Sequence, residues 1–172
     1  MLQFRARVRG IGFILWHARH MFYHVLLGLV WAWFLRELWG ELNVKWIVLS
    51  IFGSILPDLE HLFYFVSYGK ADDYGKHVIE SLKKRRWRYL VKFIESGHKS
   101  NTSLMFHNIY VIIGLLLITS LALFFDQNSW VVIFGAMVIH YIFDIFDDIV
   151  CLGYINPNWK RWGREKSKPR SI

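Results

Sequence analysis

The feature that most constrains this chain is a set of four long, predominantly apolar stretches, at residues 21–40, 45–68, 106–125 and 130–154. A bilayer core about 30 Å thick needs roughly 20 helical residues to cross it, and each stretch is long enough. Only 20% of the residues are charged and 55% are hydrophobic, whereas a soluble domain carries about a quarter charged residues. We therefore predict an all-α integral membrane bundle of four transmembrane helices, formed as one domain by residues 21–155. The alternative is a soluble bundle of very apolar helices, which is disfavoured because no long polar segment is available to cover the third stretch.

The positive charges lie almost entirely outside these stretches. Residues 1–20 hold four Lys and Arg, residues 70–105 hold nine and residues 156–172 hold six, while the connection between the third and fourth stretches holds none. Positively charged loops stay in the cytoplasm. We therefore predict a multi-pass protein of the cell (inner) membrane, with its N-terminus, long middle loop and C-terminus all cytoplasmic. Residues 1–20 are predicted to be a basic interfacial segment, and residues 156–172 a basic tail.

The middle loop contains a segment with the pattern of an amphipathic surface helix, at residues 76–96. Its apolar side includes Val78, Leu82 and Phe93, and its basic side runs through residues 83–88. Such a helix can lie in the headgroup plane, either to recognise anionic lipid or another acidic partner, or as a simple positive anchor. The net charge of +8 is thereby assigned to membrane lipids with anionic headgroups, and nucleic acid is an unlikely partner. A second copy of the chain and a membrane partner protein remain alternatives as binding partners. The single Cys151 excludes an internal disulfide.

Ionisable side chains inside the apolar stretches form the second strong pattern. With the predicted topology, every embedded His and acid falls in the cytoplasmic half of the bundle, and such residues at membrane depth are costly and usually functional. His140 and Asp144 are four residues apart and share one helix face. Pro57 cannot donate a backbone hydrogen bond, so we expect the second helix to kink beside Asp58 and His61.

These side chains suit a divalent cation, because bare carboxylates in a low dielectric repel one another and no Lys or Arg lies nearby to pair with them. Mixed His and carboxylate ligands favour zinc, with manganese or iron as alternatives, and one or two ions. The predicted metal ligands are His24, Asp58, His61, His107, His140 and Asp144.

Two further acids are candidates for the general base. Glu60 lies about two-thirds of a turn from Asp58, so it either supports a ligand or acts as the base toward a metal-bound water. Asp147 is the second candidate base, and Asp148 is ambiguous in the same way. Four other histidines show no such alignment and are interpreted as cytoplasmic surface residues: His17, His20, His77 and His98.

The pattern resembles the YdjM-like membrane-bound metal-dependent hydrolases over about residues 20 to 150. The matching residues are His24 in MFYHVLLG, Asp58 and His61 in LPDLEH, His107 in MFHN, and His140 with Asp144 in HYIFD. The resemblance implies a small four-helix membrane protein with a metal site and a hydrolase label. It supports the metal site better than any named reaction.

The chain departs from the family pattern at two places. Glu60 replaces the second Asp of the PDxDH motif, which keeps the carboxylate but lengthens it. Thr102 and Ser103 stand where the HRxxxH motif has its first His and Arg. If that His is a ligand in relatives, this chain lacks it or uses His98 instead.

Three functions are compatible with these residues. The first is a membrane-embedded metal-dependent hydrolase acting on a lipid or lipid-linked (phospho)ester at the cytoplasmic leaflet. The second is a non-enzymatic membrane scaffold with a structural metal. The third is an ion or proton pathway, which is disfavoured because the outer halves of the first, third and fourth apolar stretches are nearly free of polar residues.

Overall fold

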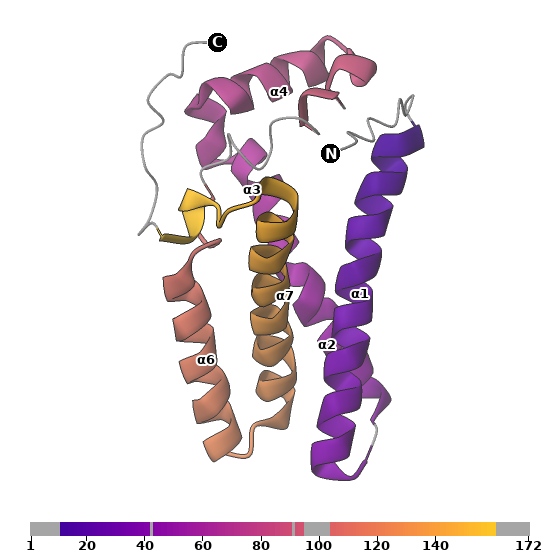
Figure 1. The fold of residues 1–172 in the computed structure, drawn as a ribbon, viewed down its shortest axis with the longest axis vertical. Coiled ribbons are helices and arrows are strands. Elements are labelled where there is room, and N and C mark those ends of the chain that lie inside the picture. The colour runs from indigo at the N-terminus through magenta and orange to yellow at the C-terminus, as the bar shows by residue number, and fades with distance from the viewer. Residues whose placement is uncertain (1–10, 42, 91, 95–103, 161–172) are drawn as a thin grey trace.

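A computed structural model describes residues 11–41, 43–90, 92–94 and 104–160, and in these residues every regular element is helical. The elements follow one another as α1 (Ile11–Trp39), α2 (Val44–Ile55), η1 (Leu56–Asp58), α3 (Leu59–Val66), η2 (Tyr68–Ala71), α4 (Asp73–Lys83), α6 (Ile109–Phe124), α7 (Asn128–Leu152) and η3 (Pro157–Lys160), where η is a 3-10 helix. The long helices run alternately up and down, and the α1–α2 and α6–α7 connections both lie at the end opposite α4 (Figure 1). The predicted all-α class is therefore confirmed.

Three helical segments are long and apolar enough to cross a membrane: Met21–Trp39, Val44–Val66 and Asn128–Val150. Many of their large apolar side chains are exposed, among them Trp33, Phe52 and Ile142. The fourth apolar helix, α6, has only 16 residues, or about 24 Å at 1.5 Å per residue. It is shorter than the predicted span at 106–125 because Asn108 caps it, accepting hydrogen bonds from the backbone N–H groups of Tyr110 and Val111.

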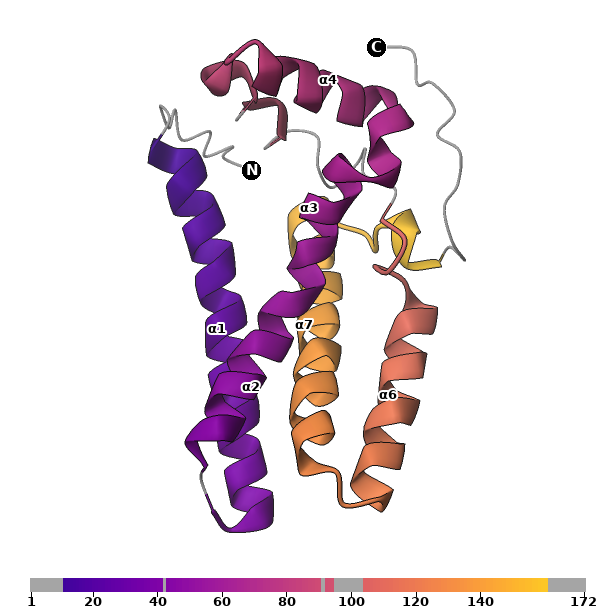
Figure 2. The same cartoon turned by 180° about the vertical axis from the view of Figure 1, so that it is seen from behind.

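Helix α2 lies against both α1 and α7, and α6 packs on the other side of α7 (Figures 1 and 2). Two glycines allow the backbones to approach closely, as small residues do between membrane helices. A Cβ atom on Gly53 would lie 2.6 Å from the Ile133 carbonyl oxygen of α7, and one on Gly28 would lie 2.8 Å from Cα of Ile51 in α2. The Trp31 indole N–H of α1 also donates to the Val132 carbonyl of α7, at 3.0 Å.

The second apolar stretch is interrupted at Pro57, where the sequence predicts a kink. The α-helix gives way to the 3-10 turn η1 around Pro57 and resumes as α3, and the chain changes direction there (Figure 2). This break carries Asp58 at its end, beside the start of α3.

The predicted surface helix at 76–96 is not continuous. Helix α4 ends at Lys83, Arg85 has a left-handed φ of 52°, and helical structure returns only at 87–90 and 92–94. The apolar side chains Val78 and Leu90 are buried in one cluster with Tyr64, so this part of the predicted face packs against the protein, whereas Leu82 is exposed.

The predicted segment 1–20 is also divided differently. Residues 11–20 are the first turns of α1, continuous with the apolar stretch, while residues 1–10 lie outside the described part of the chain. Of the predicted tail, residues 156–160 are described and include η3.

Candidate metal centre

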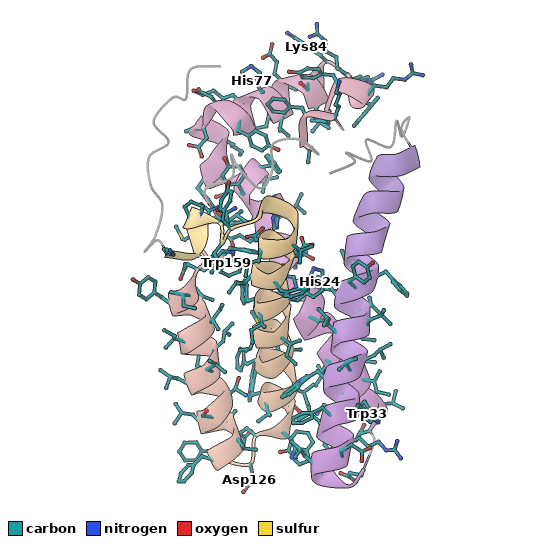
Figure 3. The ribbon with its side chains drawn as sticks, in the orientation of Figure 1. His24, Trp33, His77, Lys84, Asp126 and Trp159 are labelled. Atoms are coloured by element: carbon teal, nitrogen blue, oxygen red, sulfur yellow. The ribbon has the colours of Figure 1, made fainter. Side chains whose placement is uncertain are left out.

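Five of the six predicted ligands converge from four parts of the fold. His24 comes from α1, Asp58 from the end of η1, His107 from the turn before α6, and His140 with Asp144 from one face of α7. They form two groups that share His140, one with His24 and Asp58 and one with His107 and Asp144, and the ligand atoms within each group lie within 4.8 Å of one another. Figure 3 shows His24 directed from α1 toward α7, nearer the α4 end than Trp33.

The two carboxylates are the centres of these groups. Asp144 Oδ2 lies 3.0 Å from His140 Nε2 and 3.5 Å from His107 Nε2, and its Oδ1 lies 3.8 Å from His24 Nε2. Asp58 lies 3.7 Å from His24 Nε2 and 3.9 Å from His140 Nε2. Two ligand atoms that are each about 2.1 Å from a tetrahedral zinc ion stand about 3.4 Å apart, so these separations fit a shared cation.

A backbone carbonyl determines which nitrogen of His140 faces the carboxylates. His140 Nδ1 lies 2.6 Å from the Ser54 carbonyl oxygen, which can only accept, so Nδ1 carries the proton. In a neutral ring the Nε2 lone pair then points toward Asp144. His140 and His24 are fully buried and their rings stack with centroids 3.9 Å apart.

His107 is oriented in the same way by a side chain. Its Nδ1 lies 2.7 Å from Glu60 Oε2, and its Nε2 faces Asp144. Neither His107 Nε2 nor His140 Nε2 has a hydrogen-bond partner of good geometry in the described residues. Two nitrogen lone pairs directed at a carboxylate repel it unless a cation or an added proton lies between them, so the donor set fits a metal ion.

The site is fully buried at His24 and His140 and partly exposed at its carboxylates. The side chains of Asp58 and Asp144 are 16% and 13% exposed, and His61 is 33% exposed. His61 is the predicted ligand that joins neither group: its Nδ1 lies 3.9 Å from Asp58 Oδ1, and its ring meets the His107 ring edge-on at 5.1 Å. It stands at the accessible edge of the centre.

Glu60 is surrounded by donors rather than facing open space. Its Oε1 accepts from the Phe106 backbone N–H at 2.9 Å, from the Met105 N–H and from the Tyr68 hydroxyl at 2.6 Å. With Oε2 on His107, both oxygens are engaged. This geometry favours a supporting role over the predicted general base.

Asp147 and Asp148 take different positions on α7. Asp147 is half-buried and belongs to neither ligand group found in the described residues, so its role as base stays a prediction. Asp148 is buried and accepts from the Trp159 indole N–H at 2.8 Å, which fixes η3 beside the site. The Trp159 ring lies 5.9 Å from the His107 ring, and Figure 3 shows it on η3.

Sequence reasoning missed Ser54, Tyr68 and Trp159. The contribution of Ser54 is a backbone carbonyl, which no residue type signals, and the other two act across turns whose course the sequence does not reveal. Of the other histidines, His77 is exposed on α4 as predicted. His98, Thr102 and Ser103 lie outside the described residues, as do the side chains of His17 and His20.

Comparisons with protein-family models, with curated proteins and with solved structures find no match to this chain. The resemblance to the YdjM-like hydrolases therefore depends on the motifs alone and stays a prediction.

Proposed function

We propose that this protein is an integral membrane metal-dependent hydrolase with four transmembrane helices, acting on a lipid or lipid-linked (phospho)ester at the cytoplasmic leaflet. The observation that carries this proposal is the convergence of imidazole Nε2 atoms and two carboxylates from separate helices at a partly open site. The general part of this proposal is a metal centre embedded in the membrane, and the more specific part is that the centre catalyses hydrolysis.

The residues that would hold the metal are His24, Asp58, His107, His140 and Asp144. Zinc suits this donor set best, with manganese or iron as alternatives. Such an ion lowers the pKa of a bound water enough to supply a nucleophile near neutral pH. The half-buried Asp147 remains the candidate base, since Glu60 is engaged with His107.

The surroundings of the opening favour a lipid substrate. His61, the exposed edge of the site, lies on α3 between Leu59 and Leu62, which are both exposed apolar side chains. An apolar surface beside a polar centre suits a molecule that has an acyl chain and a polar head. The many Lys and Arg of the middle loop favour the cytoplasmic leaflet and anionic headgroups.

Burial of His24 and His140 also supports a second candidate, a structural metal that holds α1, η1 and α7 together in a scaffold protein. A structural site stabilises the fold outright, whereas a catalytic site keeps an open position. The ion pathway is not supported: in the described spans, the ionisable residues beyond the site are Arg36, Glu37 and Lys45, at the far helix ends.

Elemental analysis of the purified protein tests the metal centre. We expect bound metal in the natural chain, loss of it in His140→Ala, and retention in His77→Ala, which changes an exposed histidine on α4. Equal metal content in all three proteins, or none in the natural chain, contradicts the centre.

Chelation separates the two functions. A hydrolase should lose turnover of phospholipids or lipid-linked phosphates in mixed micelles while its unfolding midpoint falls little. If the metal is structural, its removal should instead lower the unfolding midpoint of the protein by several degrees. A metal-loaded protein with no turnover on these substrates contradicts the hydrolase.

A further inference from the structure

Glu60 joins three separate parts of the molecule at the edge of the metal centre. It lies on α3, Tyr68 belongs to η2, and Met105, Phe106 and His107 form the turn before α6. Its side chain is 4% exposed, and the groups that contact it are two backbone N–H groups, a tyrosine hydroxyl and an imidazole. Burying a carboxylate without a cationic partner costs free energy. A role for Glu60 beyond local packing would explain why the fold keeps a carboxylate at this position.

We propose that Glu60 is a positioning residue that fixes the tautomer and ring orientation of His107, so that Nε2 is presented to the metal. This inference rests on the proposed metal centre. A metal-bound histidine usually donates its other ring N–H to a carboxylate or carbonyl, which raises its basicity and holds its orientation. Glu60 Oε2, at 2.7 Å from His107 Nδ1, occupies that place, as the Ser54 carbonyl does for His140.

The donors around Glu60 explain why a carboxylate is required. Oε1 already accepts from the Phe106 N–H and the Tyr68 hydroxyl, so the oxygen of an amide at position 60 would stay there. Its NH₂ group would then face His107 Nδ1. Because two donors cannot share a hydrogen bond, His107 would move its proton to Nε2, which cannot then bind a metal.

Glu60→Gln is therefore the diagnostic change, because it keeps the shape of the side chain and its bonds to the turn before α6. We expect zinc binding, measured by competition with a chromophoric chelator, to weaken about 10- to 100-fold. Asp72→Asn is the matched control: Asp72 is also a buried carboxylate and accepts from the Tyr64 hydroxyl at 2.9 Å. This control should retain the natural affinity.

A double-mutant cycle distinguishes positioning of His107 from a general structural role of Glu60. If Glu60 acts through His107, Glu60→Gln should weaken zinc binding by less than about twofold when His107 is already Ala. The same loss in both backgrounds, or natural affinity in Glu60→Gln alone, overturns the inference.

A measurement on the metal-free protein separates this inference from the proposed function. Nitrogen NMR of labelled histidines, with His107→Ala for assignment, should show a proton on His107 Nδ1 in the natural chain and on Nε2 in Glu60→Gln. A natural chain in which His107 Nδ1 carries no proton overturns the inference. If the chain binds no zinc but the Nδ1 proton is present, the metal centre fails while the positioning of His107 stands.

Discussion

At the scale of single residues, two buried tyrosines near α4 differ in whether their hydroxyls are satisfied. Tyr64 is fully buried and donates to Asp72 Oδ2 at 2.9 Å. Tyr74 is buried in the same apolar cluster, but its hydroxyl has no hydrogen-bond partner among the described residues. Burial raises the pKa of Tyr74 further above neutral pH, so its hydroxyl keeps its proton in alkaline solution too and brings no charge into the cluster.

We expect the two Tyr→Phe changes to have different effects. Tyr64→Phe removes a hydrogen bond to a buried carboxylate and should cost about 1.5–3 kcal/mol. Tyr74→Phe removes an unsatisfied buried hydroxyl and should be neutral or stabilising by up to about 1 kcal/mol. Thermal unfolding in detergent measures both, at about 2–4 °C per kcal/mol for a chain of this size. A larger loss in Tyr74→Phe than in Tyr64→Phe contradicts this account.

At the scale of elements, the close approach of α2 and α7 couples the fold to the site. Gly53 lies directly before Ser54, whose carbonyl accepts the His140 N–H. The backbones can approach this closely because position 53 has no side chain. A small displacement of α2 therefore moves the group that sets the orientation of His140.

Gly53→Ala should be destabilising by about 1–3 kcal/mol, because the new Cβ would meet the Ile133 carbonyl oxygen at 2.6 Å. Gly114→Ala on α6 is the control, since nothing lies within 4 Å of its Cβ, and it should stabilise the helix by up to about 1 kcal/mol. The unfolding midpoint and the metal content should both fall in Gly53→Ala and not in Gly114→Ala. Equal stability in the two variants contradicts a tight α2–α7 contact.

At the scale of the whole molecule, the number of membrane-crossing helices depends on whether the short helix α6 crosses the bilayer. Its length of about 24 Å is less than the roughly 30 Å of a bilayer core, a mismatch that a membrane accommodates by local thinning. His77 on α4 and Asp126 in the α6–α7 connection lie at opposite ends of the protein (Figure 3). If α6 crosses, these two residues face opposite sides of the membrane.

Single cysteines at these two positions, in a Cys151→Ser background, test the topology. In sealed inside-out vesicles an impermeant maleimide should label His77→Cys and leave Asp126→Cys unmodified until the vesicles are opened. The reverse pattern contradicts the predicted orientation. Labelling of both residues in sealed vesicles contradicts a spanning α6.

The sequence alone determined the helical class, the long apolar helices and the break at Pro57, because these depend on local hydrophobicity and backbone chemistry. It also placed His140 and Asp144 on one face, since a four-residue spacing does so in any helix. The sequence pattern suggested one helix at 76–96, which is divided because its two halves fold back to bury Val78 and Leu90 together.

Only the tertiary structure decided which atoms face one another at the site. His140 meets a carbonyl 86 residues away and His107 meets a carboxylate 47 residues away, and those pairings follow from how the helices pack. Every residue has a carbonyl, so the residue type of Ser54 gives no signal of its role. Glu60 carries a recognisable chemistry, but whether it acts as a base or as a support depends on the donors that the turn before α6 brings to it.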